Sequence, residues 1–429
     1  MPLNQPTWFV GTDWATNKHD ICILQSDGTV AEQFQVVNSG DGLADFAERL
    51  STLVDGKTEN LWVAIETPHG AVVDTLCERG FAVFAINPKQ LDRFRDRFGA
   101  AGAKDDRRDA RVLADSLRTD PRAFRRVVPE SPEVILLREV KAVYDDLMQE
   151  KLALGNRIRE QLRRFFPQVL ELTSNVALPW VLDLLKEIPT PVVAKRKRQQ
   201  TVQRILQRHR IRKFDAETVI RTLRSTPVVA ANGVIEAASE HIQLACERLQ
   251  LVLAQIARCE KNMDAIFEKM SPPPKRSPTP DEAEAEPGQQ GEQRDVEILR
   301  SLPGIGRIVL AALLAGASLP LRERNYHALR AFTGVAPVTR RSGKQCFVTM
   351  RYACCAGLRD AMFHWAKNAV QSRPEWKVRY QALRQRGHSA ARAYRTIGDR
   401  LLRVAIRMLN DQTTYQPERI HVTQQTPAA

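Results

Sequence analysis

The chain has 429 residues, enough for two or three domains, and a formal net charge of +14 from 64 Lys and Arg against 50 Asp and Glu. Hydrophobic residues make up 43% of it, aromatic residues 6% and charged residues 27%, a mix that allows a sizeable core and favours helix-rich structure over a β sandwich. No run of about 20 apolar residues could span a bilayer, and MPLNQPTWFV lacks the runs of a signal peptide, so we expect a cytoplasmic protein without a membrane partner.

Residues 7–37 are predicted to form three short strands. WFVGTDW and HDICILQ are apolar and β-branched, VAEQFQVV alternates, and turn residues separate the three segments. The pattern then predicts a helix near 41–54, a strand at 61–66, a helix at 70–80, a strand at 81–87 and a basic helix at 88–98. This order is that of an RNase H-like α/β domain, in which a β meander feeds βαβ crossovers, and we place it at residues 1–125.

A helical, coiled-coil region is predicted over residues 130–270. Apolar residues follow one helix face from about 132 to 166, and a second long helix is expected from about 234 to 270, so the two could pair antiparallel. Between them, residues 192–213 hold nine Lys and Arg and no acid. Their consecutive cations, which would attract nucleic acid through counterion release, are Lys195, Arg196, Lys197 and Arg198.

The remainder of the chain is predicted to be a linker, a helical domain and a tail. Residues 271–293 are rich in Pro, Glu and Gln and are expected to be a disordered linker. A mostly helical C-terminal domain should span 294–412, followed by a flexible tail at 413–429. Within the domain, 299–316 contains a Pro-Gly-x-Gly turn, which is typical either of a helix-hairpin-helix that approaches a phosphate or of a tight turn between packed helices.

Four acidic residues stand at predicted structural edges. Asp13 ends the first strand and Glu66 ends the strand at 61–66, while Asp106 and Asp109 share one helix face through their three-residue spacing. If these edges converge, the carboxylates would repel one another unless cations bound between them. Two Mg²⁺ ions about 4 Å apart there would stabilise the attacking and leaving oxygens of a phosphodiester. The alternative is that each is an ordinary surface acid.

Ser342 is predicted to lie in a Gly-flanked loop beside three cations. Arg340, Arg341 and Lys344 could stabilise an alkoxide and a phosphate there, although a serine in a loop is most often a simple turn residue. Farther on, residues 373–407 hold ten Lys and Arg against two acids. That segment suits either a nucleic-acid surface or a solvated pair of amphipathic helices.

Three segments, GTDWATNKHDICIL, WVAIETPHG and GAKDDRRDARVLAD, together resemble the DEDD transposases. This family contains insertion-sequence transposases and Piv-type invertases, in which a RuvC-like domain precedes a serine-bearing domain. The family pattern Lys-x-Asp-x-x-Asp-Ala falls on residues 104–110, and its three-residue step favours Asp106 over Asp105 as the third acid. The resemblance implies that Asp13, Glu66, Asp106 and Asp109 bind the metal.

A second signature of the same family, Thr-Gly-x-Ala-Pro followed by Ser-Gly, places the family's nucleophile on Ser342. The resemblance implies a Mg²⁺-dependent recombinase that forms a transient 5′-phosphoserine link to DNA. It also implies a structured guide (bridge) RNA as partner and a homo-oligomer, either a dimer or a tetramer. Because Ser342 lies more than 200 residues from the carboxylates, the site must assemble between domains or between subunits.

Two other functions fit the same residues. A RuvC-type, structure-selective endonuclease would need the carboxylates and Mg²⁺ but not Ser342. A non-catalytic scaffold that binds nucleic acid would need only the basic surfaces.

Overall fold

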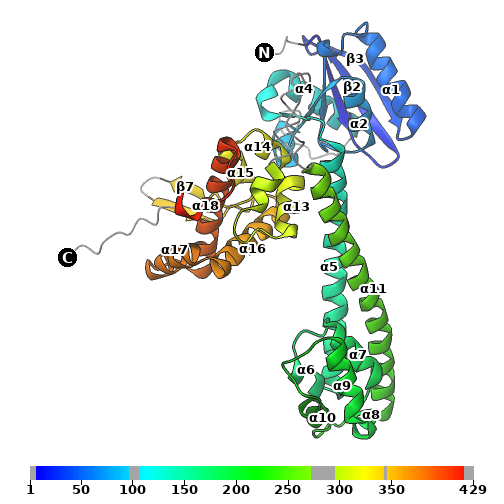
Figure 1. Ribbon diagram of the computed structural model, residues 1–429. Coiled ribbons are helices and arrows are strands. Elements are labelled where there is room, and N and C mark those ends of the chain that lie inside the picture. Colours follow the sequence, from blue (N-terminus) through cyan, green and yellow to red (C-terminus); the bar gives the residue numbers. More distant parts are fainter. Residues whose placement is uncertain (1–5, 96–105, 272–294, 343–344, 420–429) are drawn as a thin grey trace, which may run out of the picture. The chain divides into compact units, whose positions relative to one another are not determined.

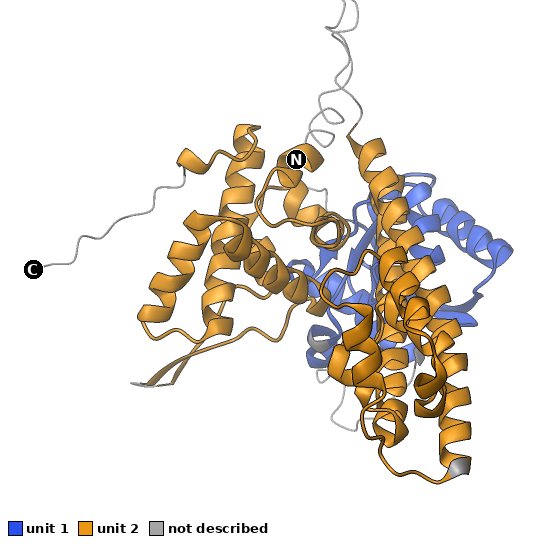
Figure 2. Cartoon of the chain, turned by 60° about the horizontal axis from the view of Figure 1, so that its bottom comes forward, with its two compact units in different colours: residues 1–130 blue, residues 131–429 orange. Residues whose placement is uncertain are grey.

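The computed structural model describes residues 6–95, 106–271, 295–342 and 345–419 (Figure 1). The chain divides into two compact units, Met1–Glu130 and Ser131–Ala429 (Figure 2). The predicted linker lies outside the described residues except for Ser271, and so do Asp105 and Lys344. Among the described helices, none is long and apolar enough to cross a membrane.

The first unit is built on a six-stranded mixed sheet. Its strands are β1 (Trp8–Asp13), β2 (Lys18–Gln25), β3 (Val30–Val37), β4 (Leu61–Ile65), β5 (Ala82–Ala85) and β6 (Arg125–Arg126), in the spatial order β3-β2-β1-β4-β5-β6. Strands β1, β4 and β5 are parallel, whereas β2, β3 and β6 pair antiparallel with their neighbours. The predicted meander and crossovers are therefore confirmed, and the carboxyl ends of the three parallel strands lie at one edge.

Helices cover both faces of this sheet because successive strand residues point to opposite sides. Helices α1 (Gly40–Leu53) and α2 (Ala71–Glu78) pack on the face that carries Val10 and Val63, and the short helix η1 (Thr58–Asn60) lies between them in the chain. Helices α3 (Pro88–Arg95) and α4 (Asp106–Thr119), the latter followed by η3 (Pro121–Ala123), pack on the face that carries Phe9 and Trp62.

The close approach of α4 to the sheet depends on Gly11 in the middle of β1. A Cβ at this position would lie 1.9 Å from the carbonyl oxygen of Ala110 and 2.7 Å from the backbone nitrogen of Ala114. Both of these atoms belong to helix backbone, which cannot swing aside as a flexible side chain would. The missing side chain therefore fixes how closely the first turns of α4 pack on β1.

The second unit begins with two long helices, α5 (Pro132–Phe165) and α11 (Asn232–Met270), which run side by side in opposite directions (Figure 1). Five short helices lie at the end where the chain turns back: α6 (Gln168–Leu172), α7 (Pro179–Glu187), α8 (Pro191–Arg196), α9 (Gln199–Arg208) and α10 (Ala216–Leu223). The basic segment 192–213 forms α8 and α9, which are separated by extended backbone at Lys197 and Arg198.

The rest of this unit is helical except for one two-stranded ribbon. Residues 295–300 are helical, and the later elements are α13 (Arg307–Gly316), α14 (Ser318–Arg322), α15 (Tyr326–Phe332), β7 (Val338–Ser342), β8 (Gln345–Thr349), α16 (Ala356–Ser372), α17 (Pro374–Gln385), α18 (Ala390–Asp411) and η5 (Pro417–Arg419). The prediction that Ser342 lies in a loop is wrong, because Ser342 is the last residue of β7. After α18, Tyr415 is held by hydrogen bonds to Trp376, Glu375 and Ser301.

We predict that Gly11→Ala lowers the free energy of unfolding of the first unit by about 2 to 3 kcal/mol, because α4 must move off β1 to admit the methyl group. Urea denaturation with far-UV circular dichroism measures this change. Gly40→Ala is the control, since a Cβ at Gly40 meets no atom within 4 Å. Equal stability of the two variants would contradict the role assigned to Gly11.

Candidate functional site

Two of the predicted acids meet at the carboxyl edge of the sheet. Asp13 is the last residue of β1, and Glu66 directly follows β4. The two strands are parallel neighbours, with Thr12 opposite Ile65 in the register. Alternation along each strand places both acids on the face that α4 covers. The sequence prediction that these two strand ends converge is thus met by the sheet topology.

Asp109 lies in the first turns of α4, immediately before the Ala110 that contacts Gly11. Its side chain is only 6% exposed, so the carboxylate is held against the sheet rather than in solvent. Asp106 begins the same helix one turn earlier. The described structure extends to the backbone of Asp106 but not to its side chain.

A cation from the protein itself lies among these acids. The Arg95 guanidinium donates from Nε and Nη2 to the two carboxylate oxygens of Asp109, at 3.0 and 2.9 Å, and Nη2 also lies 3.7 Å from Oε2 of Glu66. Its Nη1 donates to Oδ1 of Asp92 at 2.7 Å. Burial disfavours the charged guanidinium, but the hydrogen bonds to Asp109 and Asp92, together with the negative charges of Asp109 and Glu66, raise the pKa of Arg95.

Asp20 is an acid of this sheet face that the sequence reasoning missed. It is the cross-strand partner of Asp13 and is only 6% exposed. Gln35 Nε2 donates to its Oδ1 at 3.2 Å. The signal in the sequence was a carboxylate inside the apolar run HDICIL, since a strand buried on both faces seldom carries an acid without a partner or a function.

The chemistry of these side chains suits a hard divalent cation. Carboxylate oxygens are the ligands that Mg²⁺ prefers. The guanidinium of Arg95 already places a positive charge between Glu66 and Asp109, so these two acids favour a cation at this point. Among the described side chains, no three acidic, histidine or cysteine residues are yet close enough to hold a metal ion. The acids that would hold one are Asp13, Glu66 and Asp109, together with Asp106.

Ser342 lies in a different setting, at the end of an exposed ribbon in the second unit. It pairs with Gln345, and the residues between the strands lie outside the described part of the chain. Arg340, two residues earlier, shares its ribbon face and is opposite Phe347, whereas Arg341 points to the other face. All of these side chains are exposed. The ribbon therefore presents a hydroxyl and a guanidinium to solvent side by side.

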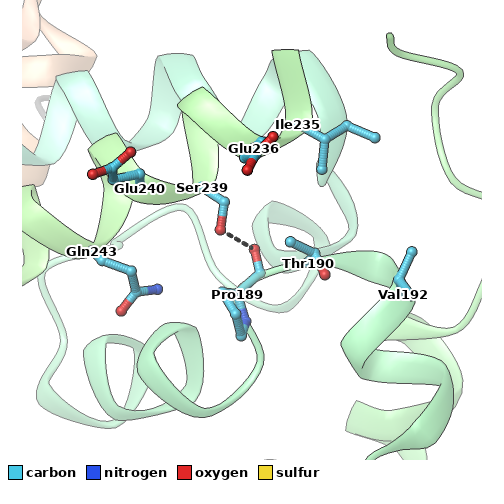
Figure 3. Close-up of a pocket in the computed structure, with 8 residues that line it drawn as sticks. All are labelled: Pro189, Thr190, Val192, Ile235, Glu236, Ser239, Glu240 and Gln243. Carbon is cyan, nitrogen blue, oxygen red and sulfur yellow. Dashed lines mark hydrogen bonds between the residues drawn. The ribbon is translucent and has the colours of Figure 1, made fainter. Parts of the chain in front are cut away.

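The predicted basic contacts at the far end of the helix pair are mostly exposed. Lys195, Arg196 and Arg198 face solvent, while Lys197 donates to Glu187 at 2.6 Å. A hollow between the start of α8 and the first turns of α11 lies nearby (Figure 3). Its lining includes the acids Glu236 and Glu240, so it does not suit a phosphate.

The Pro-Gly-x-Gly turn before α13 is packed against helix α16. Gly304 adopts φ +71°, and a Cβ there would lie 2.3 Å from the backbone nitrogen of Ala369. Trp365 Nε1 donates to the carbonyl oxygen of Pro303 at 2.9 Å. At the start of α13, Arg307 pairs with Asp264 and Glu260 of α11. These contacts assign the first glycine a packing role.

Comparison with known families gives two matches at the two ends of the chain. A family model for DEDD transposases of the IS110 type, described as a transposase, matches residues 10–167. A second model, described as the transposase IS116/IS110/IS902 family, matches residues 296–381. The first match contains the carboxylates and the second contains the ribbon with Ser342.

Individual relatives carry the same names. A Streptomyces coelicolor protein, named as a candidate mini-circle transposase for IS117, is 30% identical over 403 residues, which is 92% of each chain. A Sinorhizobium fredii protein, named as a candidate transposase, is 50% identical over 211 residues, and the match spans 48% of this chain and 58% of that protein. An uncharacterised protein of insertion element IS110 from Streptomyces coelicolor is 25% identical over 427 residues, 95% of each chain.

A buried histidine holds the segment that follows Asp13. The ring of His19 is fully buried at the start of β2, and its Nδ1 accepts a hydrogen bond from the backbone N–H of Ala15 at 3.4 Å. Burial lowers the pKa of His19 below its ordinary value of 6.5. The folded state therefore binds its proton more weakly than the unfolded state does.

We predict that His19 makes the first unit less stable as the pH falls below about 6.5, because protonation then favours the unfolded chain. Once the pH is below the lowered folded-state pKa, both states are protonated and this loss is complete. Chemical denaturation between pH 7.5 and 4.5 measures this change, and the free energy of unfolding should depend less steeply on pH in His19→Gln than in the wild type. His69→Gln, which removes an exposed imidazole of the same unit, is the control, and an identical slope in wild type and His19→Gln would refute the assignment.

Proposed function

The chain belongs to the IS110 family of DEDD transposases, and from that premise we propose that it cuts and rejoins DNA with Ser342 as the nucleophile and a carboxylate-bound metal as its aid. Family membership makes it a transposase of an IS110/IS116-type insertion element with DNA as its substrate. The proposal adds the residues, the metal and the guide.

The observation that supports the proposal best is the placement of three acids on one face of the first unit's sheet. Asp13 and Glu66 follow neighbouring parallel strands, and Asp109 faces the same edge from α4. The strand order, with a meander β3-β2-β1 beside parallel β4 and β5, supports the RNase H-like fold that we propose for this domain. We therefore assign residues 1–125 to a RuvC-like domain and 294–412 to the serine-bearing domain.

In the proposed reaction the Oγ of Ser342 attacks the phosphorus of a DNA phosphodiester. A bond from Oγ to phosphorus forms, the bond to the 3′ oxygen breaks, and the 3′-hydroxyl leaves with a proton while the serine proton passes to solvent. Arg340, on the same ribbon face, balances charge on the phosphate. A 3′-hydroxyl from the new partner strand then attacks the phosphoserine and releases Ser342.

When bound, Mg²⁺ would supply charge stabilisation at the phosphate oxygens. Asp13, Glu66, Asp106 and Asp109 would hold it, and Asp20, the cross-strand partner of Asp13, would add a further carboxylate beside them that a bound cation could neutralise. Because the serine and the acids belong to separate units, we propose that the site is completed when DNA brings the units or subunits together. A dimer or a tetramer serves this assembly.

We propose a structured guide RNA as a second partner, bound by the basic segment 192–213. Support comes from the exposed cations Lys195, Arg196 and Arg198 at the end of the helix pair.

We expect RNA from the protein's own element to co-purify with the wild-type protein. Neutralising the three cations together should remove that RNA, and sequencing of the nucleic acid bound to both proteins tests this. Equal RNA recovery from both would exclude this surface.

We predict that Ser342→Ala abolishes strand exchange, a loss of about four orders of magnitude or more, because the attacking oxygen is removed. An assay that joins labelled donor and target DNA measures the activity. Thr339→Ala, which removes an exposed hydroxyl from the other face of the same strand, is the matched control and should stay active. If Ser342→Ala still cuts DNA in a Mg²⁺-dependent way without a covalent intermediate, the endonuclease alternative replaces this proposal.

We predict that Glu66→Gln lowers strand exchange at least about a hundredfold, because a neutral amide holds a divalent cation poorly. Removal of divalent ions with EDTA should have the same effect on the wild-type protein, and added Mg²⁺ should restore it. Glu59→Gln, at an exposed acid of the same unit, is the control. Full activity of Glu66→Gln would instead favour the non-catalytic scaffold.

A further inference from the structure

Arg95, the last residue of α3, makes more contacts with acidic side chains than a helix end requires. Among the described residues it contacts carboxylates from three elements: Asp92 on its own helix, Asp109 on α4 and Glu66 after β4. A surface arginine gains little from one exposed partner. Here the guanidinium instead engages both oxygens of a nearly buried carboxylate in a bidentate pair.

We propose that Arg95 is a built-in counter-ion for the metal site, which occupies the space between Glu66 and Asp109 without metal and leaves it when the metal binds. The inference rests on the proposed role of these two acids as ligands. It assigns to Arg95 a positioning role, because the guanidinium sets where the carboxylates lie before loading.

The burial of Asp109 explains why such a cation is needed. Its side chain is 6% exposed, and an ionised carboxylate removed from water is strongly destabilising unless a cation or several donors compensate it. Glu66 is also partly buried, at 30% exposure of its side chain. Without metal, two negative charges on one sheet face would repel each other, and Arg95 neutralises this repulsion.

The same geometry makes Arg95 and the metal compete. A divalent cation bound to oxygens of Glu66 and Asp109 would lie within a few ångströms of the guanidinium, and the two positive charges would repel. Nη2, shared between the two acids, must therefore move away.

Asp92 provides a place for the displaced side chain. It lies one turn before Arg95 on α3, accepts from Nη1 at 2.7 Å, and has a side chain that is 65% exposed. The guanidinium can turn toward Asp92 and solvent without losing every partner. Metal loading is then coupled to a rearrangement at the end of α3.

The test measures Mn²⁺ binding to the full-length protein without nucleic acid, by electron paramagnetic resonance. Arg95→Met keeps the length of the side chain and removes the competing charge. Its affinity for the Mn²⁺ site that Glu66→Gln abolishes should rise about tenfold over wild type. Arg93→Met removes an equal charge from an exposed position on the same helix and should bind Mn²⁺ as wild type does.

Thermal unfolding gives the second readout. In EDTA, Arg95→Met should unfold at a lower temperature than wild type, because Asp109 has lost its partner, and saturating Mn²⁺ should raise its midpoint more than that of wild type. If Arg95→Met does not fold without metal, Arg95→Lys serves in its place. A lysine cannot make the bidentate pair. The Mn²⁺ affinity of Arg95→Lys should therefore exceed that of wild type, but by less than the tenfold rise expected for Arg95→Met.

Unchanged or weaker Mn²⁺ binding by Arg95→Met, beside a normal Glu66-dependent site in wild type, would overturn the inference and leave the proposed metal site intact. Absence of any Glu66-dependent Mn²⁺ site in both proteins would overturn the metal assignment itself. The two failures are therefore distinguishable.

Discussion

The contact between Gly11 and the backbone of α4 is the constraint on which the first unit's site depends. Only the absence of a side chain lets the helix approach so closely that Ala110 lies against β1. Asp109, the preceding residue, is thereby fixed over the carboxyl edge where Asp13 and Glu66 end their strands. A chain that lost this contact would keep its acids in sequence and lose their proximity in space.

Bringing acids together creates an electrostatic cost that the fold must offset. In this unit the offset is local, since one guanidinium serves three carboxylates and its best partner is the most buried of them. Asp20 has a different solution, a neutral amide from Gln35 on the neighbouring strand. On this sheet face Asp109 is therefore stabilised by a cation and Asp20 by a neutral amide. Of these two partners, Arg95 is the one that another cation can replace.

The strands of the first unit could be predicted because burial and period-two alternation act together in runs such as HDICIL. The ribbon of Ser342 could not be predicted in this way, because every residue of β8 is exposed and no hydrophobic face marks the strand. The signal in the sequence was the dipeptide Gly-Lys between two segments that contain β-branched residues, a pattern that favours a hairpin. Likewise, the ion pair between Arg95 and Asp109 joins residues of different helices, so no sequence spacing reports it, and Asp20 was passed over as part of an ordinary strand.

The paired helices α5 and α11 also act as a rigid spacer of defined length. A helix rises about 1.5 Å per residue, so the 34 residues of α5 carry the five-helix cluster about 50 Å from its start, close to the length of fifteen base pairs of duplex. The length of the two helices sets the direction in which the five-helix cluster faces as well as its distance from the start of α5. One residue inserted into a helix turns everything beyond it by about 100°, whereas seven residues inserted into both partners lengthen the arm and restore nearly the original facing.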